Sequence, residues 1–136
     1  MENKVSPTDL RLGNWLYDSQ PSGFPMQVSA LGKDWVQLDF DGNEGDCFEN
    51  SDKEIYPIPL TEHLFINMGF KKVPCKLDKN DYTLMKDNMF VSFIYKHTFG
   101  ISINGSNGIF IDYVNELQNV YHTLTNKELK IEMEWI

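Results

Sequence analysis

The N-terminal part of the chain alternates short apolar runs with turn residues, a pattern that is typical of β-structure. In WVQLDF, residues 35–40, the apolar side chains of Val36, Leu38 and Phe40 recur at every second position, and DGNEG follows as a hairpin turn. GNWLY and QVSAL predict two further strands. Four or five short strands in about 50 residues, without a helical period, predict a small bent sheet or SH3-like barrel.

A first helix is predicted where the spacing of apolar residues changes, in IYPIPLTEHLFINMGF. Pro57 and Pro59 favour an extended segment, and Thr61 is a good N-cap for the helix that follows. Gly69 stands where a helix commonly ends in a left-handed glycine. The pattern therefore predicts a helix of about two turns, which is introduced by a proline-rich segment.

Strand patterns return in YTLMK, MFVSFIYKH, GISIN and GIFID, and the short DN and GSNG sequences between them are typical of tight turns. This part of the chain predicts an antiparallel meander, and KIEMEWI at the end predicts a final strand. The fold class is therefore α+β. We expect a β-rich unit in residues 1–58 and an α+β unit in residues 59–136, packed as one domain or two.

VNELQNVYHTLTNKEL, residues 114–129, is the most regular helical stretch. We expect Asp112 to cap this helix and Asn126 to end it in the left-handed conformation. The apolar residues fall within an arc of roughly 120°, which predicts a buried face. That face comprises Val114, Leu117, Val120, Tyr121 and Leu124. The opposite, exposed face comprises Asn115, Glu116, Gln118, Asn119, His122 and Thr123.

Charge is distributed unevenly along the chain. Residues 1–60 hold 4 Lys/Arg and 11 Asp/Glu, a net charge of −7, whereas residues 61–136 hold 8 and 9, a net charge of −1. Arg11 is the only arginine, and an acidic surface repels polyanions, so the composition argues against nucleic-acid binding. No stretch approaches the roughly 18 apolar residues of a membrane span, and two cysteines without a CxxC motif fit reduced thiols, so we expect a cytoplasmic protein.

The acidic hairpin is a candidate surface for a basic protein partner, through Asp41, Glu44, Asp46 and Glu49. A calcium loop is not supported: in a loop that starts at Asp39, the glycine position holds Glu44 and the bidentate glutamate position holds Asn50. We therefore predict no metal site. The alternative interpretation of the acidic run is an ordinary solvated hairpin.

Two further polar groups are candidate binding residues. Lys71, Lys72, Lys76 and Lys79 follow the first predicted helix closely and form a candidate site for a phosphate or carboxylate, the alternative being a solvated lysine-rich loop. Exposed aromatic residues beside these lysines would strengthen the site. A stripe on the second helix is a third candidate, with an ordinary solvated helix face as its alternative; it comprises Asn115, Gln118, Asn119 and His122.

No catalytic constellation is recognisable in the sequence. The histidines at positions 63, 97 and 122 lack an HxxxH or HExxH spacing, and no GxSxG motif is present. Acidic neighbours would raise the pKa of Cys47 and make it a poor nucleophile. The glycines of NGSNG are spaced as in a hairpin turn, and we predict no cofactor.

Three stretches resemble a group of small uncharacterised proteins of Bacteroidetes and their phages. They are LRLGNWLY, PIPLTEHLFINMGF and YVNELQNVYHTLTNKEL, and a related LQN(L/V)Y...LT(G/N)(K/E)EL ending recurs in that group. Asn126 stands where such relatives often have glycine. The resemblance implies a bacterial or phage setting and supplies no activity, ligand or catalytic residue.

The sequence thus favours a non-catalytic binding protein with a protein partner. One alternative is a protein that binds or sequesters a phosphorylated or nucleotide-like ligand, for example as a phage counter-defence factor, with a homo-oligomer completing its pocket. The other is an enzyme of unrecognised type. We expect no nucleic-acid or membrane partner.

Overall fold

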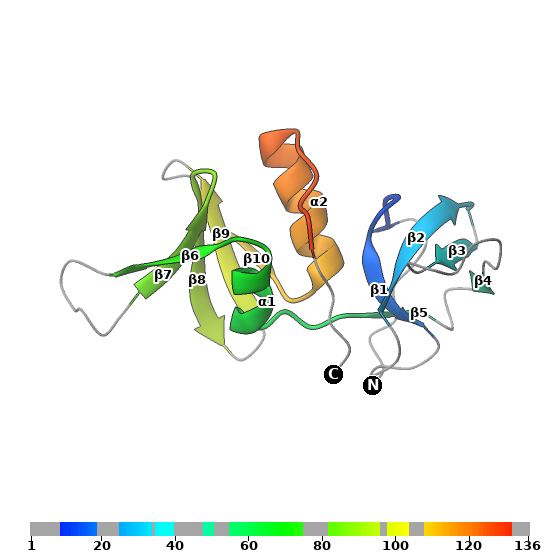
Figure 1. Ribbon diagram of the computed structural model, residues 1–136, viewed down its shortest axis with the longest axis horizontal. Coiled ribbons are helices and arrows are strands. Elements are labelled where there is room, and N and C mark those ends of the chain that lie inside the picture. The colour runs from blue at the N-terminus through cyan, green and yellow to red at the C-terminus, as the bar shows by residue number, and fades with distance from the viewer. Residues whose placement is uncertain are drawn as a thin grey trace. The chain divides into compact units, whose positions relative to one another are not determined.

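The computed structural model describes residues 9–18, 25–33, 35–39, 48–50, 55–74, 82–95, 98–103 and 108–131. The chain divides into two compact units (Figure 1). Unit 1 comprises Met1–Ile58 with Met133–Ile136, and unit 2 comprises Pro59–Glu132. The fold is α+β, as predicted, with an antiparallel sheet in unit 1 and an antiparallel sheet and two helices in unit 2.

Unit 1 contains a five-stranded sheet in the order β4-β3-β2-β1-β5. Its strands are β1 (Trp15–Asp18), β2 (Pro25–Leu31), β3 (Val36–Asp39), β4 (Phe48–Asn50) and β5 (Ile55–Pro57). The first four strands form a meander, and β5 returns to pair with β1. Within the described residues no pairing joins β4 to β5, so the sheet is open and the predicted closed SH3-like barrel is not observed.

The core of unit 1 follows from strand alternation. Val36 and Leu38 of β3 are buried, as predicted, and they face the same side as the buried residues of β1 and β2 because directly paired residues share a face. The core cluster comprises Leu10, Leu16, Met26, Val28, Val36 and Leu38. Removing these side chains from water drives the assembly of the sheet.

A tight turn precedes β1, so the predicted GNWLY strand begins two residues later than expected. Gly13 adopts φ 89°, a conformation that favours glycine. The fully buried side chain of Asn14 accepts a hydrogen bond from the Arg11 backbone N–H at 2.7 Å. Backbone bonds from Gly13 to Val28 and from Val28 to Asn14 attach this turn to β2.

Unit 2 contains the predicted antiparallel meander, in the order β10-β9-β8-β7-β6. Its strands are β6 (Lys71–Pro74), β7 (Tyr82–Lys86), β8 (Met89–Tyr95), β9 (Thr98–Ile103) and β10 (Ile109–Ile111). Asp87 and Asn88 both have positive φ in the β7–β8 turn, as the DN sequence predicted. The predicted GSNG turn lies largely outside the described residues, as does the predicted KIEMEWI strand; Lys130 and Ile131 are not in a strand.

Strand β6 corrects the interpretation of the lysine-rich segment as a loop. Residues 71–74 pair with β7 in a continuous register from Lys71 opposite Met85 to Pro74 opposite Tyr82. Lysine and proline suit an edge strand, since a charged side chain and a missing N–H discourage a further strand from pairing. The local composition resembles that of a loop, and pairing with β7 determines the strand.

Helix α1 (Glu62–Asn67) has both predicted caps. The Thr61 side chain accepts a hydrogen bond from the Leu64 N–H at 3.2 Å. At the other end Gly69 adopts φ 96°, and the Phe70 N–H donates to the Phe65 carbonyl at 3.1 Å. The rings of Phe65 and Phe70 meet edge to face with centroids 5.3 Å apart, so the C-terminal cap is also an apolar contact.

Helix α2 (Val114–Thr125) starts differently from the prediction. Tyr113, rather than Asp112, is the N-cap residue. The carboxylate of Glu116 accepts hydrogen bonds from the backbone N–H groups of Asp112 and Tyr113 at 3.0 and 3.1 Å, whereas the Asp112 side chain accepts one from Thr98. The helix ends at Asn126 in the left-handed conformation, as predicted, with φ 59°.

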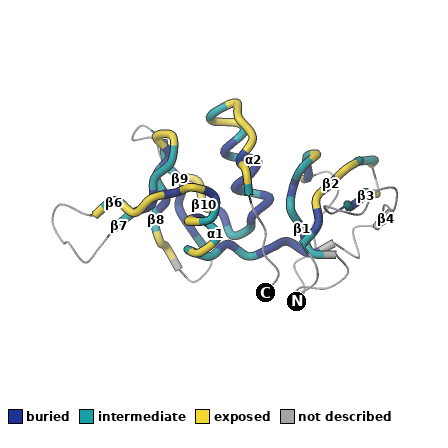
Figure 2. The backbone as a smooth tube through the Cα atoms, viewed as in Figure 1, coloured by how far each residue is buried: buried dark blue, intermediate teal, exposed yellow. Residues whose placement is uncertain are grey.

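The buried face of α2 is rotated relative to the predicted face. Asn115 is only 4% exposed and Gln118 is also buried, whereas Leu124 is 37% exposed. Figure 2 shows both buried and exposed residues along α2. The buried arc is shifted by roughly 80° towards the two amides, at 100° per residue. Apolar periodicity located the helix correctly, but it assigned the amides to solvent because it counts only hydrophobic positions.

Candidate functional site

The structure describes part of the acidic group that the sequence proposes for partner binding. Asp41, Glu44 and Asp46 lie outside the described residues. Glu49 lies in β4, where its backbone is paired with Gln37 of β3.

The side of the unit 1 sheet that faces away from the core is mainly polar and aromatic. Strand alternation places Gln27, Ser29, Gln37 and Asp39 there, and Trp15 pairs with Gln27 on the same face. We call this surface the polar sheet face. It combines hydrogen-bonding groups and a carboxylate with aromatic rings, so it can contact a partner that carries both apolar and cationic groups.

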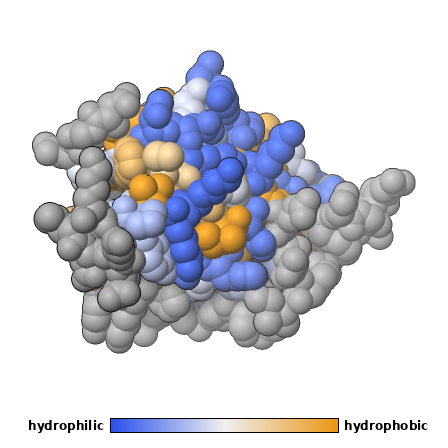
Figure 3. Space-filling model, turned by 60° about the vertical axis from the view of Figure 1, so that its left-hand side comes forward, coloured by the Kyte–Doolittle hydropathy of each residue, from blue (hydrophilic) through white to orange (hydrophobic). Residues whose placement is uncertain are grey.

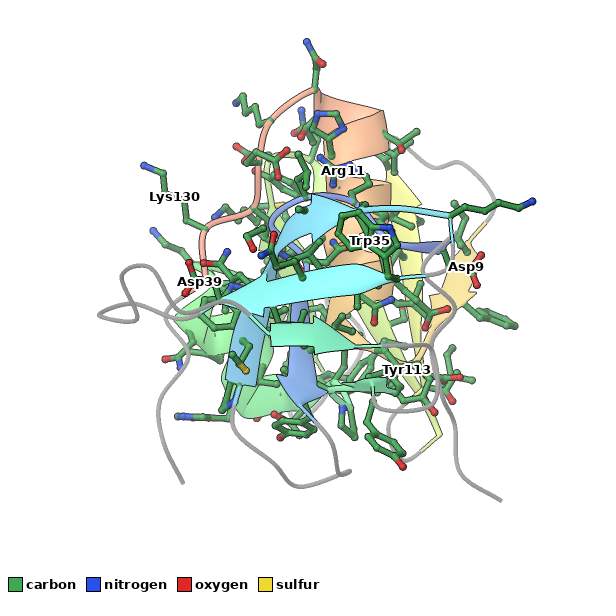
Figure 4. All side chains as sticks on the ribbon, turned by 90° about the vertical axis from the view of Figure 1, so that its right-hand side faces the viewer. Asp9, Arg11, Trp35, Asp39, Tyr113 and Lys130 are labelled. Carbon is green, nitrogen blue, oxygen red and sulfur yellow. The ribbon has the colours of Figure 1, made fainter. Side chains whose placement is uncertain are left out.

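Trp35 is the most exposed aromatic side chain in the described part of this unit, with 42% of its surface accessible. A Cβ atom at Gly32 would lie 1.9 Å from the indole Nε1 of Trp35, so the indole lies against the glycine backbone. The Gly32 N–H also donates to the Trp35 carbonyl at 3.0 Å. Trp35 directly precedes β3, and Asp39 is the last residue of β3. Trp35 and Asp39 therefore lie at opposite ends of this strand (Figure 4).

Tyr17 adds a further aromatic ring to the polar sheet face. It pairs with Pro25 of β2 and Tyr56 of β5, and it is half-buried. Burial raises the pKa of the Tyr17 hydroxyl above its usual value of 10.0, so the side chain is neutral and able to donate a hydrogen bond at physiological pH.

The lysine group divides between the described and undescribed parts of the chain. Lys71 and Lys72 are exposed on β6, and Lys76 and Lys79 lie outside the described residues. The Lys72 ammonium lies 4.7 Å from the centroid of the Tyr82 ring, a cation–π contact. Phe93, which is 43% exposed, meets the Tyr82 ring edge to face at 5.5 Å. Lys72 therefore contacts a half-buried aromatic ring, and that ring in turn meets the exposed Phe93.

These rings belong to a row that runs into the core of unit 2. The row continues from Phe93 to Phe99 with centroids 5.7 Å apart, and from Phe99 to Phe65 of α1 at 4.8 Å. Phe99 and Phe65 are buried. The inner rings fix the outer pair, Tyr82 and Phe93, so the exposed end of the row is held in place without a ligand.

A carboxylate lies at the same end of the row. The Tyr82 hydroxyl donates a hydrogen bond to Glu62 in the first turn of α1. This bond joins the helix to β7. The Lys72–Tyr82–Phe93 surface offers one cation and two aromatic rings to a planar anionic group. The nearby carboxylate of Glu62 opposes the binding of such a group.

The proposed polar stripe on α2 is split by burial. Asn119 and His122 are half-buried, and the His122 Nε2 lies 3.7 Å from the carboxylate of Glu128. Asn115 and Gln118 are buried, so the four residues do not form one exposed surface. Within the described residues, the Oδ1 atom of Asn115 is buried and accepts no hydrogen bond.

A polar contact within unit 2 ties α2 to the β7–β8 turn. The buried Tyr121 donates a hydrogen bond from its hydroxyl to Asp87, which lowers the pKa of that carboxyl. Burial and the hydrogen bond to Asp87 raise the pKa of Tyr121 to about 12. The Lys86 ammonium lies 5.8 Å from the Tyr121 ring and donates to the Met68 carbonyl at 2.6 Å, which adds the end of α1 to the same contact.

Groups of side chains that could hold a metal ion do not occur among the described residues. No three His, Cys, Asp or Glu side chains there are placed to hold a metal ion. His63 is exposed on α1 and His122 lies on α2, while His97 lies outside the described residues. The sequence does not single out Tyr82, Phe93 or Trp35 as candidates, because only the strand pairing and the exposure of each side chain distinguish them from core aromatics.

No protein-family model, curated protein or solved structure matches this chain. In the described residues no helix has the length and apolar character that a membrane crossing requires.

Proposed function

We propose that the protein is a non-catalytic binding protein whose unit 1 recognises a basic protein partner through the polar sheet face. The setting that we propose, from the sequence resemblance, is the cytoplasm of a bacterium or of its phage-infected host. One observation carries the proposal: the half-exposed Trp35 stands at the start of β3 in the unit that holds the entire net charge of the protein.

The proposed binding surface combines the negative charge of unit 1 with an exposed aromatic side chain, Trp35. Unit 1 contains 4 Lys/Arg and 12 Asp/Glu, a net charge of −8, and unit 2 contains 8 of each, a net charge of zero. Tryptophan and tyrosine are enriched among residues that dominate binding energy, and both rings attract Lys and Arg side chains. The acidic charge would speed the encounter with a basic partner, and Trp35 would supply short-range affinity.

The test measures binding of an arginine- and lysine-rich peptide by isothermal titration calorimetry at salt concentrations from about 0.05 to 0.5 M. We expect binding to weaken with salt. Replacing Asp41, Glu44, Asp46 and Glu49 by Asn or Gln should weaken binding at low salt. Trp35→Ala should reduce affinity at least about tenfold at every salt concentration, the loss of roughly 1.4 kcal/mol that is typical of a contact that matters.

Leu12→Ala is the matched control, because Leu12 is an exposed apolar residue of the same unit. It should bind like the wild type. Equal binding by the wild type and Trp35→Ala would contradict the proposal, since the peptide would then respond to net charge alone.

A second function, binding of a small phosphorylated or nucleotide-like ligand, is favoured by the contact between Lys72 and Tyr82. Lys72 would meet the anionic group, and the exposed parts of Tyr82 and Phe93 would contact the planar part. The negative charge of Glu62 opposes an anion at this surface, so we expect weaker binding than at a site with several cations. This function does not require the polar sheet face.

Thermal-shift measurements with inorganic phosphate and a nucleotide panel test this second function. A nucleotide should raise the melting temperature of the wild type and of Lys130→Gln, an exposed lysine of the same unit, but not that of Lys72→Gln. Glu62→Gln should enlarge the shift. Equal shifts in Lys72→Gln and Lys130→Gln would remove the Lys72 surface as the site.

A further inference from the structure

The unit 2 sheet has a second face, opposite to the one on which its core residues lie. Leu84, Val91, Ile101 and Ile111 point to the core side and are buried. The register and the alternation of side chains place the residues between them on the other side. This face, which we call the outer face, contains the apolar residues Val73, Met85, Phe90, Ile94 and Phe110, together with Gly100 and the hydroxyl-bearing residues Thr83, Ser92, Thr98 and Ser102.

The outer face exposes two large apolar side chains. Phe110 is 68% exposed and Ile94 is 49% exposed. Both side chains lie beside Gly100: a Cβ atom there would be 3.4 Å from Ile94 and 3.6 Å from Phe110, so they cover the glycine together. Figure 3 shows one face of the molecule, on which apolar side chains lie at the surface among polar ones. An antiparallel sheet normally places polar residues on its solvated face.

Charge is confined to two opposite corners of this face. Lys71 lies on the edge strand β6, in line with Met85, and Asp112 follows the other edge strand, where it accepts a hydrogen bond from Thr98. Within the described positions between these corners, the outer face carries no charge. Protein interfaces commonly have this arrangement, an uncharged centre and a polar rim.

The two edges of the sheet also differ. Strand β6 carries two lysines and a proline, which discourage contact, whereas β10 is Ile-Phe-Ile and exposes Ile109 and Phe110. Phe110 extends the exposed apolar surface of the outer face to this edge, whereas Ile109 pairs with Ile101 and lies on the opposite side of the sheet. Proteins commonly place charged residues on such a surface when it has no partner, because an exposed apolar edge promotes association.

We infer that the outer face of unit 2 is the contact surface of a homodimer, in which two copies pack their sheets face to face. Two observations favour a second copy. Unit 2 has no net charge, so the units that meet do not repel each other over long range. The centre of the face has no charged group among its described residues with which to select a charged partner, and an uncharged apolar face can pack against the same face of a symmetry mate.

The area of the face determines how strong this dimer can be. Five strands about 4.8 Å apart and roughly five residues long cover roughly 400 Å². Two copies would bury on the order of 800–1,000 Å², which is below the roughly 1,200 Å² of the smallest stable interfaces. The dimer is therefore weak, with a dissociation constant on the order of 10–1,000 μM, and it forms at high local concentration. The inference does not depend on the proposed partner of unit 1.

Sedimentation equilibrium of the full chain between about 10 μM and 1 mM tests the dimer. The wild type should change from monomer to dimer in this range, and association should not weaken between about 0.05 and 0.5 M salt, because apolar contacts are not screened. Phe110→Glu and Ile94→Glu should each weaken association at least about tenfold, as expected for a charge placed at the centre of an interface. Both side chains are exposed, so these variants should fold, which circular dichroism would verify.

Leu12→Glu is the matched control, an exposed apolar residue of unit 1 changed to the same charge. It should dimerise like the wild type. A wild type that remains monomeric at about 1 mM would overturn the inference. So would a dimer that Phe110→Glu and Ile94→Glu leave intact, or one that Leu12→Glu disrupts to the same extent, because the contact would then involve another surface.

Discussion

The two sheets of this protein have the same number of strands and the same antiparallel pairing, yet their solvent-facing sides differ in chemistry. In unit 1 that side presents Gln27, Gln37 and Asp39, with Trp35 at one end of β3. In unit 2 the corresponding positions hold Phe90 and Phe110 among other apolar residues. The shared architecture does not require this difference, and we propose that it reflects two kinds of partner.

Each sheet has its own buried core, and the largest expected effect comes from removing part of either one. Leu38 in unit 1 and Leu84 in unit 2 are fully buried. Leu38→Ala and Leu84→Ala should each reduce the free energy of unfolding by about 2 to 5 kcal/mol. Hydrogen exchange should show the loss of protection mainly in the strands of the mutated unit. An equal loss of protection in both units would mean that the two units unfold together and are not separately stable.

Helix α2 offers a sharper test of the buried surface of unit 2. Leu117→Ala should destabilise by about 2 to 5 kcal/mol, because Leu117 is fully buried, whereas Leu124→Ala should cost less than about 1 kcal/mol. Urea titration measures both values. Similar losses of stability in the two variants would show that Leu124 is buried, as the apolar periodicity predicted.

The contact between Tyr121 and Asp87 predicts a dependence on pH that is specific to unit 2. Tyr121→Phe should cost about 1 kcal/mol and allow the pKa of Asp87 to rise towards its usual value. The stabilisation from Asp87 is present above its unfolded pKa of 3.8 and is lost as pH falls through its lowered folded pKa. The stabilisation from Tyr121 is present below its unfolded pKa of 10.0 and is lost as pH rises through its folded pKa of about 12.

Chemical denaturation across pH measures the free energy of unfolding in both the acidic and the basic range. NMR of the carboxyl resonances gives the pKa of Asp87. Thr123→Val is the matched control, because it removes a hydroxyl of the same helix that donates to the Asn119 carbonyl at 2.8 Å. That variant should leave the pKa of Asp87 unchanged. An unchanged pKa of Asp87 in Tyr121→Phe would show that another group lowers it.

The smallest expected effect concerns the buried amide of Asn115. Its Oδ1 has no hydrogen-bond partner in the described residues, so Asn115→Leu, a change of similar volume, should be neutral within about 0.5 kcal/mol or stabilising. Gln118 is the contrast on the same helix, because it does take part in an interaction, and Gln118→Leu should cost about 1 to 3 kcal/mol. Urea titration compares the two variants, and a marked loss in Asn115→Leu would reveal a partner for the Asn115 amide.

Local features of the fold could be predicted because their causes lie within a few residues. Thr61, Gly69 and Asn126 act as caps through their own side chains or backbone freedom, and the Asp87-Asn88 turn needs only residues that tolerate positive φ. Alternation located β3 for the same reason. These features need no knowledge of the rest of the chain.

Features that depend on distant partners could not be predicted. Strand β6 exists because residues 71–74 pair with β7, and its own lysines and proline indicate a loop. Asn115 and Gln118 are buried by tertiary structure, which helical periodicity does not report. The Tyr82–Phe93 pair beside Lys72 required the register of three strands, so the sequence suggested the lysines but not the aromatic rings that accompany them.

The central claim is that the two sheets serve different partners, and two-dimensional ¹H–¹⁵N NMR of the wild type tests it. Spectra are recorded with an arginine- and lysine-rich peptide added, and separately while the protein is diluted from about 1 mM. The peptide should shift the indole resonance of Trp35 and the side-chain amides of Gln27 and Gln37, and added salt should reverse these shifts. Dilution should shift the amides of β8, β9 and β10 instead. The claim would be contradicted if the peptide and dilution shifted resonances of the same unit. It would also be contradicted if the peptide left the indole resonance of Trp35 unchanged.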